Sequence, residues 1–139
     1  MNTMLSRLTA TAIIIATCPM LAFAEDAKEL AIKKDRQLME GTWKVVTVEV
    51  NGAISMAEEV KKFTVTNEAD GKWVLFTDGK EICRGTSTID PSSKIKTIEF
   101  TITEGSGSGN RYHGIYEISK NNRKMCFGPA DKTRPSEFK

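Results

Sequence analysis

The stretch GTWKVVTVEV, residues 41–50, decides the fold of this chain. It is rich in valine, and β-branched residues of this kind favour a pleated, half-buried strand. Trp43 and Val45 fall on one face of that strand, and Val46, Val48 and Val50 fall on the other. A Gly-x-Trp at the head of a first strand is what we expect where an indole plugs the closed end of a small antiparallel barrel. The stretch therefore predicts a barrel, and through the barrel a binding role.

The chain beyond this stretch is a series of short apolar runs separated by turn signals. Residues 97–103 alternate cleanly, with Ile98, Phe100 and Ile102 on one face. Even spacing with hairpin turns predicts an all-β antiparallel meander, closed as a barrel or folded as a sandwich. The turn signals are Asn51-Gly52, Ala69-Asp70-Gly71, Asp78-Gly79, Asp90-Pro91-Ser92 and Lys120-Asn121-Asn122.

Two short helices are predicted beside the strands. Residues 25–40 are rich in Lys, Glu, Ala and Leu, and Gly41 follows as a stop signal. This helix leads onto the barrel, and its polarity suits a lid or spacer more than a core element. Ser55 and Glu58 have the spacing of a capping box. The expected inner faces are Leu30, Ala31, Lys34 and Leu38 for the first helix, and Met56, Val60 and Phe63 for the second.

Residues 1–24 have the pattern of a secretory signal peptide. Arg7 is the only charge before Glu25, an apolar core follows it, and the segment ends in Ala22-Phe23-Ala24. We expect cleavage after Ala24 and export to the periplasm or the extracellular space. A membrane anchor is the alternative, but the apolar core is shorter than the roughly 20 residues that a span requires. A further alternative is a lipoprotein signal with Cys18 as the modified cysteine. Thr17 precedes Cys18, however, where such signals prefer a smaller residue.

The remaining residues form one domain, 41–139, behind the helical segment 25–40. The chain carries 20 Lys and Arg against 18 Asp and Glu, and this balance gives no basic patch that suggests nucleic acid. His113 is the only histidine and there is no Cys-x-x-Cys, so we expect no metal and no cofactor. The loop of residues 105–109 fits no catalytic glycine motif. Glu99 and Glu117 could form a catalytic pair of acids, but carboxylates on strands more often face outward into solvent. We expect a protein that is not an enzyme.

Two cysteines follow the signal segment, Cys83 and Cys126. In an oxidising compartment they could form a disulfide. Closing a loop of about 44 residues would stabilise the fold by about 4 kcal/mol in the chain-entropy model. The alternative is two small hydrophobic residues on strands that never meet. Strand pairing decides between these interpretations.

Five segments together resemble a known family. They are GTWKVV at 41–46, EVNG at 49–52, GIYEI at 114–118, MCF at 125–127 and RPSEF at 134–138. The chain resembles, over residues 28–138, the bacterial lipocalin-like domain family of unknown function that is abundant in planctomycetes. The resemblance implies a lipocalin-like barrel outside the cytoplasm and implies no known substrate.

Two positions depart from the family pattern. Arg123 stands where the family usually has an apolar residue, which suggests a frayed strand start or a local salt bridge. Family members also continue past the last segment with one more apolar strand, whereas this chain stops at Lys139. We therefore expect a barrel that closes incompletely between edges near residues 46–50 and 124–127. Such an edge is usually covered or paired, here by the 25–40 helix, by Glu137-Phe138 or by a second copy of the chain.

The expected function is non-enzymatic binding of a small, mainly apolar ligand inside the barrel. The alternative for the same side chains is that they simply fill the core. A rival function is protein interaction or inhibition in the cell envelope through the open edge or the hairpin loops. The candidate lining residues are Trp43, Trp73, Phe100, Tyr116 and Phe127.

Overall fold

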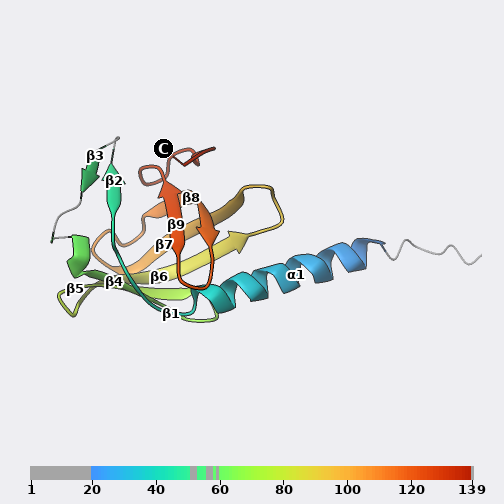
Figure 1. Ribbon diagram of the computed structural model, residues 1–139, viewed down its shortest axis with the longest axis horizontal. Helices are drawn as coiled ribbons and strands as arrows, with labels where there is room; N and C mark the ends of the chain where they lie inside the picture. Colours follow the sequence, from blue (N-terminus) through green and yellow to red (C-terminus); the bar gives the residue numbers. More distant parts are fainter. Residues whose placement is uncertain (1–19, 51–52, 56–57, 59, 139) are drawn as a thin grey trace, which may run out of the picture.

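The computed structural model describes residues 20–50, 53–55, 58 and 60–138. These residues form one long helix, one large sheet and one small hairpin (Figure 1). Most of the expected signal peptide, including Arg7 and Cys18, lies outside the described residues. The elements are α1 (Met20–Met39), β1 (Gly41–Lys44), β2 (Val48–Val50), β3 (Ala53–Ser55), the 3-10 turn η1 (Val60–Lys62), β4 (Phe63–Asn67), β5 (Lys72–Thr77), β6 (Lys80–Asp90), β7 (Lys96–Gly105), β8 (Arg111–Ile118) and β9 (Arg123–Phe127).

The large sheet has seven antiparallel strands in the order β1-β4-β5-β6-β7-β8-β9. From β4 to β9, each strand pairs with its neighbours in sequence through a turn, as the turn signals predict. The sheet curls into a half-barrel (Figure 1), and its outer strands β1 and β9 do not pair with each other. The prediction of an all-β, incompletely closed lipocalin-like barrel with an N-terminal helix is confirmed.

The first strand is shorter than the sequence predicts. The last backbone hydrogen bond from this segment to β4 runs from the N–H of Val45 to the carbonyl of Phe63. Val46 is 71% exposed, and the chain then leaves the large sheet to form β2, which pairs with β3. The edge of the half-barrel is therefore β1, not residues 46–50. A strand with valines on both faces is stable only if both faces are packed against other parts of the protein. The half-barrel buries only one face of its sheet, so the valine-rich strand does not continue in it.

The second predicted helix is wrong in the part that the structure describes. Ser55 pairs with Val48 in the β2–β3 hairpin, so it cannot begin a helix there. Only one 3-10 turn, at Val60–Lys62, precedes Phe63, which begins β4. Val50 pairs with Ala53, which places the predicted Asn51-Gly52 turn between the two strands, outside the described residues. Met56 also lies outside them.

One face of the curled sheet is buried, and we call it the inner face. Residues directly opposite each other on paired strands share a face, so the register identifies its members. Two buried clusters lie on it, and the partly buried Phe100 packs against both. The first contains Met39, Ile89, Ile98 and Tyr116, and the second contains Trp73, Cys83 and Ile102.

The C-terminal half of α1 packs on the inner face through a polar anchor. Asp35 is only 3% exposed, and its carboxylate accepts hydrogen bonds of 2.8 Å from Tyr116 Oη and from Lys96 Nζ. Arg36 donates to Ser87 Oγ at 2.7 Å on β6. These contacts fix the helix across one end of the half-barrel, so α1 is part of the core packing and not a polar spacer.

The predicted inner face of this helix is also wrong. Leu30 is 67% exposed, whereas Met39 is 3% exposed and Ile32 packs beside it. The buried side is set by Asp35 and Arg36, whose partners lie on strands more than 50 residues later. A search for apolar periodicity cannot identify a helix face that is anchored by charge.

Tyr116 makes stability sensitive to alkaline pH. Burial, and then the hydrogen bond to Asp35, raise the pKa of the Tyr116 phenol well above its usual value. The unfolded phenol ionises near pH 10 while the folded phenol stays protonated, so the stabilisation is complete below about pH 10 and declines above it. We expect the urea-unfolding free energy of the wild type to fall more steeply above about pH 10 than that of Tyr116→Phe. Parallel curves for the two proteins would contradict the buried Asp35–Tyr116 contact.

Candidate functional site

Four aromatic rings form a continuous row on the inner face. Trp73 and Phe100 have ring centroids 6.0 Å apart, Phe100 and Phe127 are also 6.0 Å apart, and Phe127 and Tyr112 are 5.8 Å apart. All three pairs meet edge to face, a favourable arrangement for aromatic quadrupoles. We call these four residues the aromatic row. It crosses β5, β7, β8 and β9 and so reaches the open edge of the sheet.

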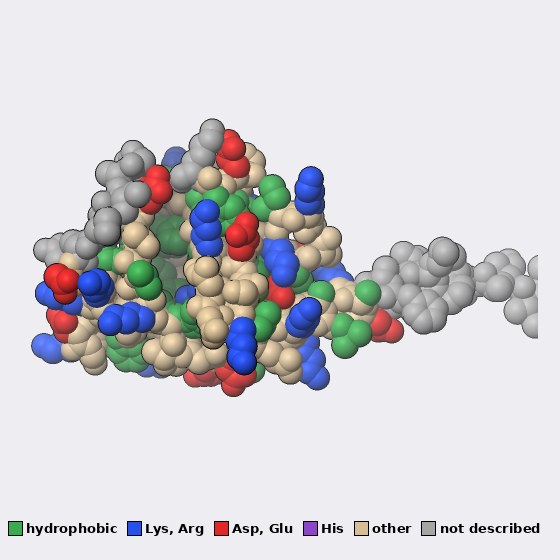
Figure 2. Space-filling view, viewed as in Figure 1, with side chains coloured by type: hydrophobic (Ala, Val, Ile, Leu, Met, Phe, Trp, Pro, Cys, Tyr) green, Lys and Arg blue, Asp and Glu red, His purple; other side chains and the backbone are tan. Residues whose placement is uncertain are grey.

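The row is buried at one end and exposed at the other. Trp73 is 8% exposed, whereas Phe127 at the end of β9 is 50% exposed. Figure 2 shows a hollow in the molecular surface beside β9, with hydrophobic side chains on its floor. Val65, Leu75 and Ile82 pack against the Trp73 end and are only partly buried. The arrangement offers an apolar surface, open to solvent at Phe127, on which an apolar molecule can lie.

The opposite end of the half-barrel is closed by Trp43. Its indole Nε1 donates a hydrogen bond of 2.7 Å to the carbonyl of Met39, the last residue of α1. The guanidinium carbon of Arg123 lies 5.1 Å from the centroid of an indole ring of Trp43. Burial lowers the pKa of Arg123 to about 10. Trp43 therefore joins the helix end and β1 to the first residue of β9, across the gap where the sheet does not close.

This contact accounts for the unusual arginine in the sequence. β9 begins at Arg123, which pairs with Ile118, so the strand start is not frayed. The guanidinium stacks on an indole in a cation–π contact, and it forms no salt bridge with another residue that the structure describes. An apolar side chain at this position could not make that electrostatic contact.

The five candidate lining residues all lie on the inner face, but they belong to three different sets of contacts. Trp73, Phe100 and Phe127 belong to the aromatic row, and Trp43 lies in the closing contact. Tyr116 is 1% exposed and is held by Asp35, so it belongs to the packing under α1.

Sequence reasoning missed Tyr112 as a member of the row. It lies opposite Phe100 in the sheet and contacts Phe127. Its spacing of four residues from Tyr116 on one strand places both on the same face. That alternation was the available signal.

Two side-chain N–H donors near the row are buried and have no acceptor among the described residues. They are Trp73 Nε1 and Asn67 Nδ2. Asn67 and Trp73 are directly opposite each other on β4 and β5. Gly85 lies opposite Trp73 on the other side, where a Cβ would come within 2.8 Å of the indole and would collide with the Thr101 carbonyl. Glycine at 85 thus provides the room that the Trp73 ring occupies.

Cys83 and Cys126 are free thiols. They lie on β6 and β9, which β7 and β8 separate in the sheet. Cys83 is 4% exposed and packs with Trp73 and Ile102. Burial, and then the charge of Glu81, raise the pKa of its thiol, which disfavours the reactive thiolate.

The polar side chains of the opposite face form paired contacts. Glu99 lies 3.1 Å from Nδ1 of His113 and 3.4 Å from Nε of Arg111. Glu117 lies opposite Lys124 on β9, so the structure does not bring Glu99 and Glu117 together as a pair of acids. Among the residues that the structure describes, no cluster of three or more His, Cys, Asp or Glu side chains is arranged to hold a metal. Within the same part of the chain, no helix has the length and apolar character needed to cross a bilayer.

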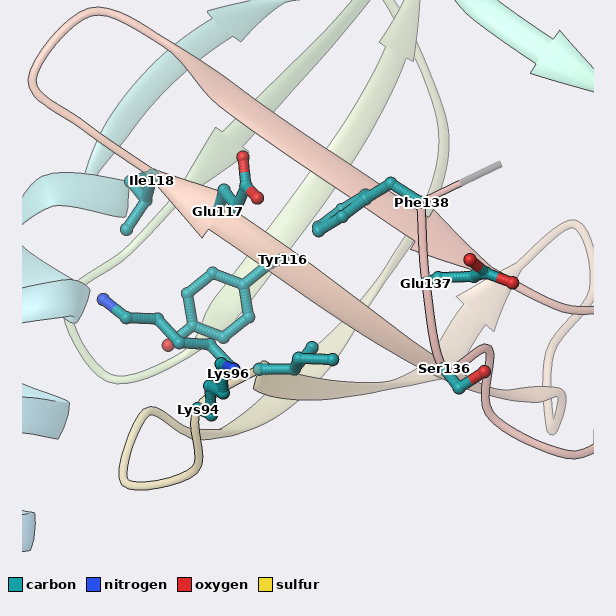
Figure 3. A pocket seen from close by; sticks show the side chains of 9 residues that line it. Lys94, Lys96, Tyr116, Glu117, Ile118, Ser136, Glu137 and Phe138 are labelled. Carbon is teal, nitrogen blue, oxygen red and sulfur yellow. The ribbon is translucent and has the colours of Figure 1, made fainter.

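A second hollow, of about 380 Å³, lies beside the C-terminal segment (Figure 3). Phe138 borders it, and Lys124 Nζ of β9 lies 4.7 Å from the Phe138 ring centroid. Residues 128–138 contain no strand, so Glu137-Phe138 contacts the sheet without pairing to its edge. The lining is Lys94, Ile95, Lys96, Tyr116, Glu117, Ile118, Ser136, Glu137 and Phe138.

No protein family, no curated protein and no solved structure matches this chain. The function of the site is therefore argued from its own chemistry.

The closing contact can be measured by a double-mutant cycle between Trp43 and Arg123. We expect Trp43→Ala to lower the free energy of unfolding by about 3 kcal/mol, because it removes a large ring from a packed position. Trp43→Phe, which loses the N–H to Met39 and part of the ring but keeps an aromatic face, should cost less, about 1 kcal/mol. The cycle of Trp43→Ala with Arg123→Met should give a coupling of about 1 kcal/mol in urea unfolding. Additive effects of the two substitutions would mean that the ring and the guanidinium do not interact.

Proposed function

We propose that this chain is an exported, non-enzymatic lipocalin-like protein that binds a small, mainly apolar ligand along the aromatic row. The observation that carries the proposal is the half-exposed ring of Phe127, stacked edge to face on a row that continues inward to Trp73. A large aromatic side chain left exposed beside a hollow is typical of an interaction site. Export rests on the signal-peptide pattern of residues 1–24.

The degree of burial argues against core filling as the whole explanation. Tyr116 and Trp73 are nearly inaccessible and suit a core role. Phe127 does not, because half of its surface remains in contact with water, and burying that surface under a ligand is favourable. In the part of the chain that the structure describes, no strand pairs with the outer edge of β9, which leaves this end of the row open.

The charges near the inner face support binding more than catalysis. Asp35 Oδ2 already accepts hydrogen bonds from Lys96 and Tyr116, and Arg36 is bound to Ser87. The Glu99–His113 pair lies on the opposite face of the sheet, away from the aromatic row. These groups have structural partners already, which favours a non-enzymatic role. Membership of the lipocalin-like family named above belongs to this proposal and rests on the five sequence segments.

A second candidate function is protein interaction through the open edges. It is favoured by the unpaired outer edges of β1 and β9 and by the exposed Val46 (71%) and Val48 (38%) beside them. An unpaired edge presents backbone N–H and C=O groups that another chain can pair with. A second copy of this chain is the simplest such partner.

Titration with the neutral apolar dye phenylnaphthylamine tests the ligand-binding proposal. We expect saturable fluorescence enhancement in the wild type and about tenfold weaker binding by Phe127→Ala, because that change removes most of a buried aromatic contact. Leu30→Ala is the matched control, since Leu30 is an exposed apolar residue on α1, outside the row. Equal affinities in all three proteins would place the dye elsewhere. A stable dimer that binds no dye would favour the edge-pairing alternative.

A further inference from the structure

The large sheet has two unpaired edges that run in the same direction. Its six strand pairs are all antiparallel, so the direction reverses six times and β9 runs the same way as β1. Among the described residues, neither β1 (Gly41–Lys44) nor β9 (Arg123–Phe127) has a partner on its outer side. We call the gap between these two edges the slot. Direct pairing of its edges would give a parallel ladder, whereas one strand between them would be antiparallel to both.

The contact between Trp43 and Arg123 brings the two edges near each other. The indole and the guanidinium meet on the inner face of the sheet, with 5.1 Å between the guanidinium carbon and the centroid of an indole ring. Neighbouring strands lie about 4.8 Å apart, so one inserted strand needs edges that are about 10 Å apart. Two long side chains that reach toward each other can span such a gap. The backbone edges above the contact stay available for pairing.

Exposed hydrophobic side chains border the slot. Beyond Trp43 and Arg123 the two chains run in the same direction, toward Val46 and Val48 on one side and toward Phe127 on the other (Figure 1). These last three residues belong to the five large hydrophobic side chains that are exposed in the described part of the chain. Exposed apolar surface that gathers in one place is typical of an interaction site. Here it lies beside unpaired backbone N–H and C=O groups, with which an added strand can pair.

The charges at the slot indicate which side chains the added strand carries. Successive side chains of a strand point to opposite faces, so Lys44 on β1 and Lys124 on β9 both lie on the outer face. Both lysines are exposed, and neither edge strand contains an acidic residue. Glu117 lies opposite Lys124 on β8, on the side away from the slot. Acidic side chains on the outer face of an added strand would therefore lie next to two lysines, which is favourable.

We propose that the slot binds one extended segment of another protein, which pairs with both edges at once as an antiparallel strand. Its inward side chains are apolar and cover Phe127, and its outward side chains are acidic and lie beside Lys44 and Lys124. The partner segment thus alternates apolar and acidic residues, and it adds an eighth strand to the seven of the sheet. Binding of such a strand goes beyond the small-ligand function and does not require it.

Fluorescence polarisation with labelled synthetic peptides tests this proposal. The probe is a seven-residue peptide that alternates valine and glutamate, and its matched control carries lysine in place of glutamate. We expect saturable binding of the acidic probe and about tenfold weaker binding of the basic control, because like charges on neighbouring strands repel each other. Lys44→Glu should reduce this preference several-fold. Lys80→Glu should leave it unchanged, because Lys80 is an exposed lysine at the start of β6, outside the slot. Equal binding of the two peptides, or binding of neither, would overturn the proposal.

Methylation of single backbone nitrogens in the acidic probe tests whether both edges take part. Successive N–H groups of a strand point to opposite sides, so one faces β1 and the next faces β9. We expect methylation at either of two adjacent central positions to weaken binding by about tenfold, because each methyl group removes a hydrogen bond from one ladder. Weakening at only one of the two positions would show that the peptide adds to a single edge. Weakening at neither would show binding without strand pairing. Either result contradicts the slot.

The oligomeric state distinguishes a foreign strand from a second copy of this chain. We expect sedimentation equilibrium to show a monomer that forms a one-to-one complex with the acidic probe. A stable dimer that binds no peptide would show that a second copy occupies the edges, and it would overturn the proposal. Peptide binding as described, together with no binding of phenylnaphthylamine, would support the slot and count against the small-ligand function alone.

Discussion

Trp43 holds together the two ends of a sheet that does not close. Its ring supports the guanidinium of Arg123 at the start of β9, and its N–H donates to the last carbonyl of α1. A closed barrel joins its first and last strands by a ladder of backbone hydrogen bonds. Here β1 and β9 lack that ladder, and the contact between Trp43 and Arg123 spans the gap between them. The shape of the half-barrel depends on that contact because no strand pairing links the edges in its place.

The two ends of the half-barrel differ in what covers them. At the end with Trp43, α1 adds Met39 to the core and buries Asp35 against Lys96 and Tyr116. At the other end, no helix among the described residues covers β9, and Phe127 stays half exposed in the aromatic row. Buried packing therefore lies on the side of the helix, and accessible apolar surface lies on the side of the open edge. The proposed ligand site follows from this asymmetry.

The parts of the fold that sequence could predict are those with local causes. Turn residues such as Asp78-Gly79 and the alternation of Ile98, Phe100 and Ile102 identify strands without knowledge of their partners. The Gly-x-Trp pattern also predicted a special role for Trp43. Three of the five candidate site residues lie in the aromatic row. They could be predicted because alternation along each strand assigns them to one face of the sheet.

The parts that sequence could not predict depend on distant partners. The buried face of α1 is set by Asp35, whose partners are Lys96 and Tyr116 on β7 and β8. The early end of β1 depends on the extent of β4 beside it. Arg123 looked anomalous because its partner, Trp43, lies 80 residues earlier in the chain. Tyr116 was assigned to the site because its position on the strand places it on the inner face. That position is the same for a buried phenol held by a carboxylate as for an accessible one.

Amide hydrogen exchange of the native protein, resolved by residue, tests most directly whether the sheet is open between β1 and β9. The central strands β5 to β8 have neighbours on both sides, so their amides should exchange slowly and together. In β1 and β9, alternate amides that point away from the single neighbouring strand should exchange much faster. Uniform slow exchange along both outer strands would show that the edges are paired, with each other or with a second chain, and would contradict the open half-barrel.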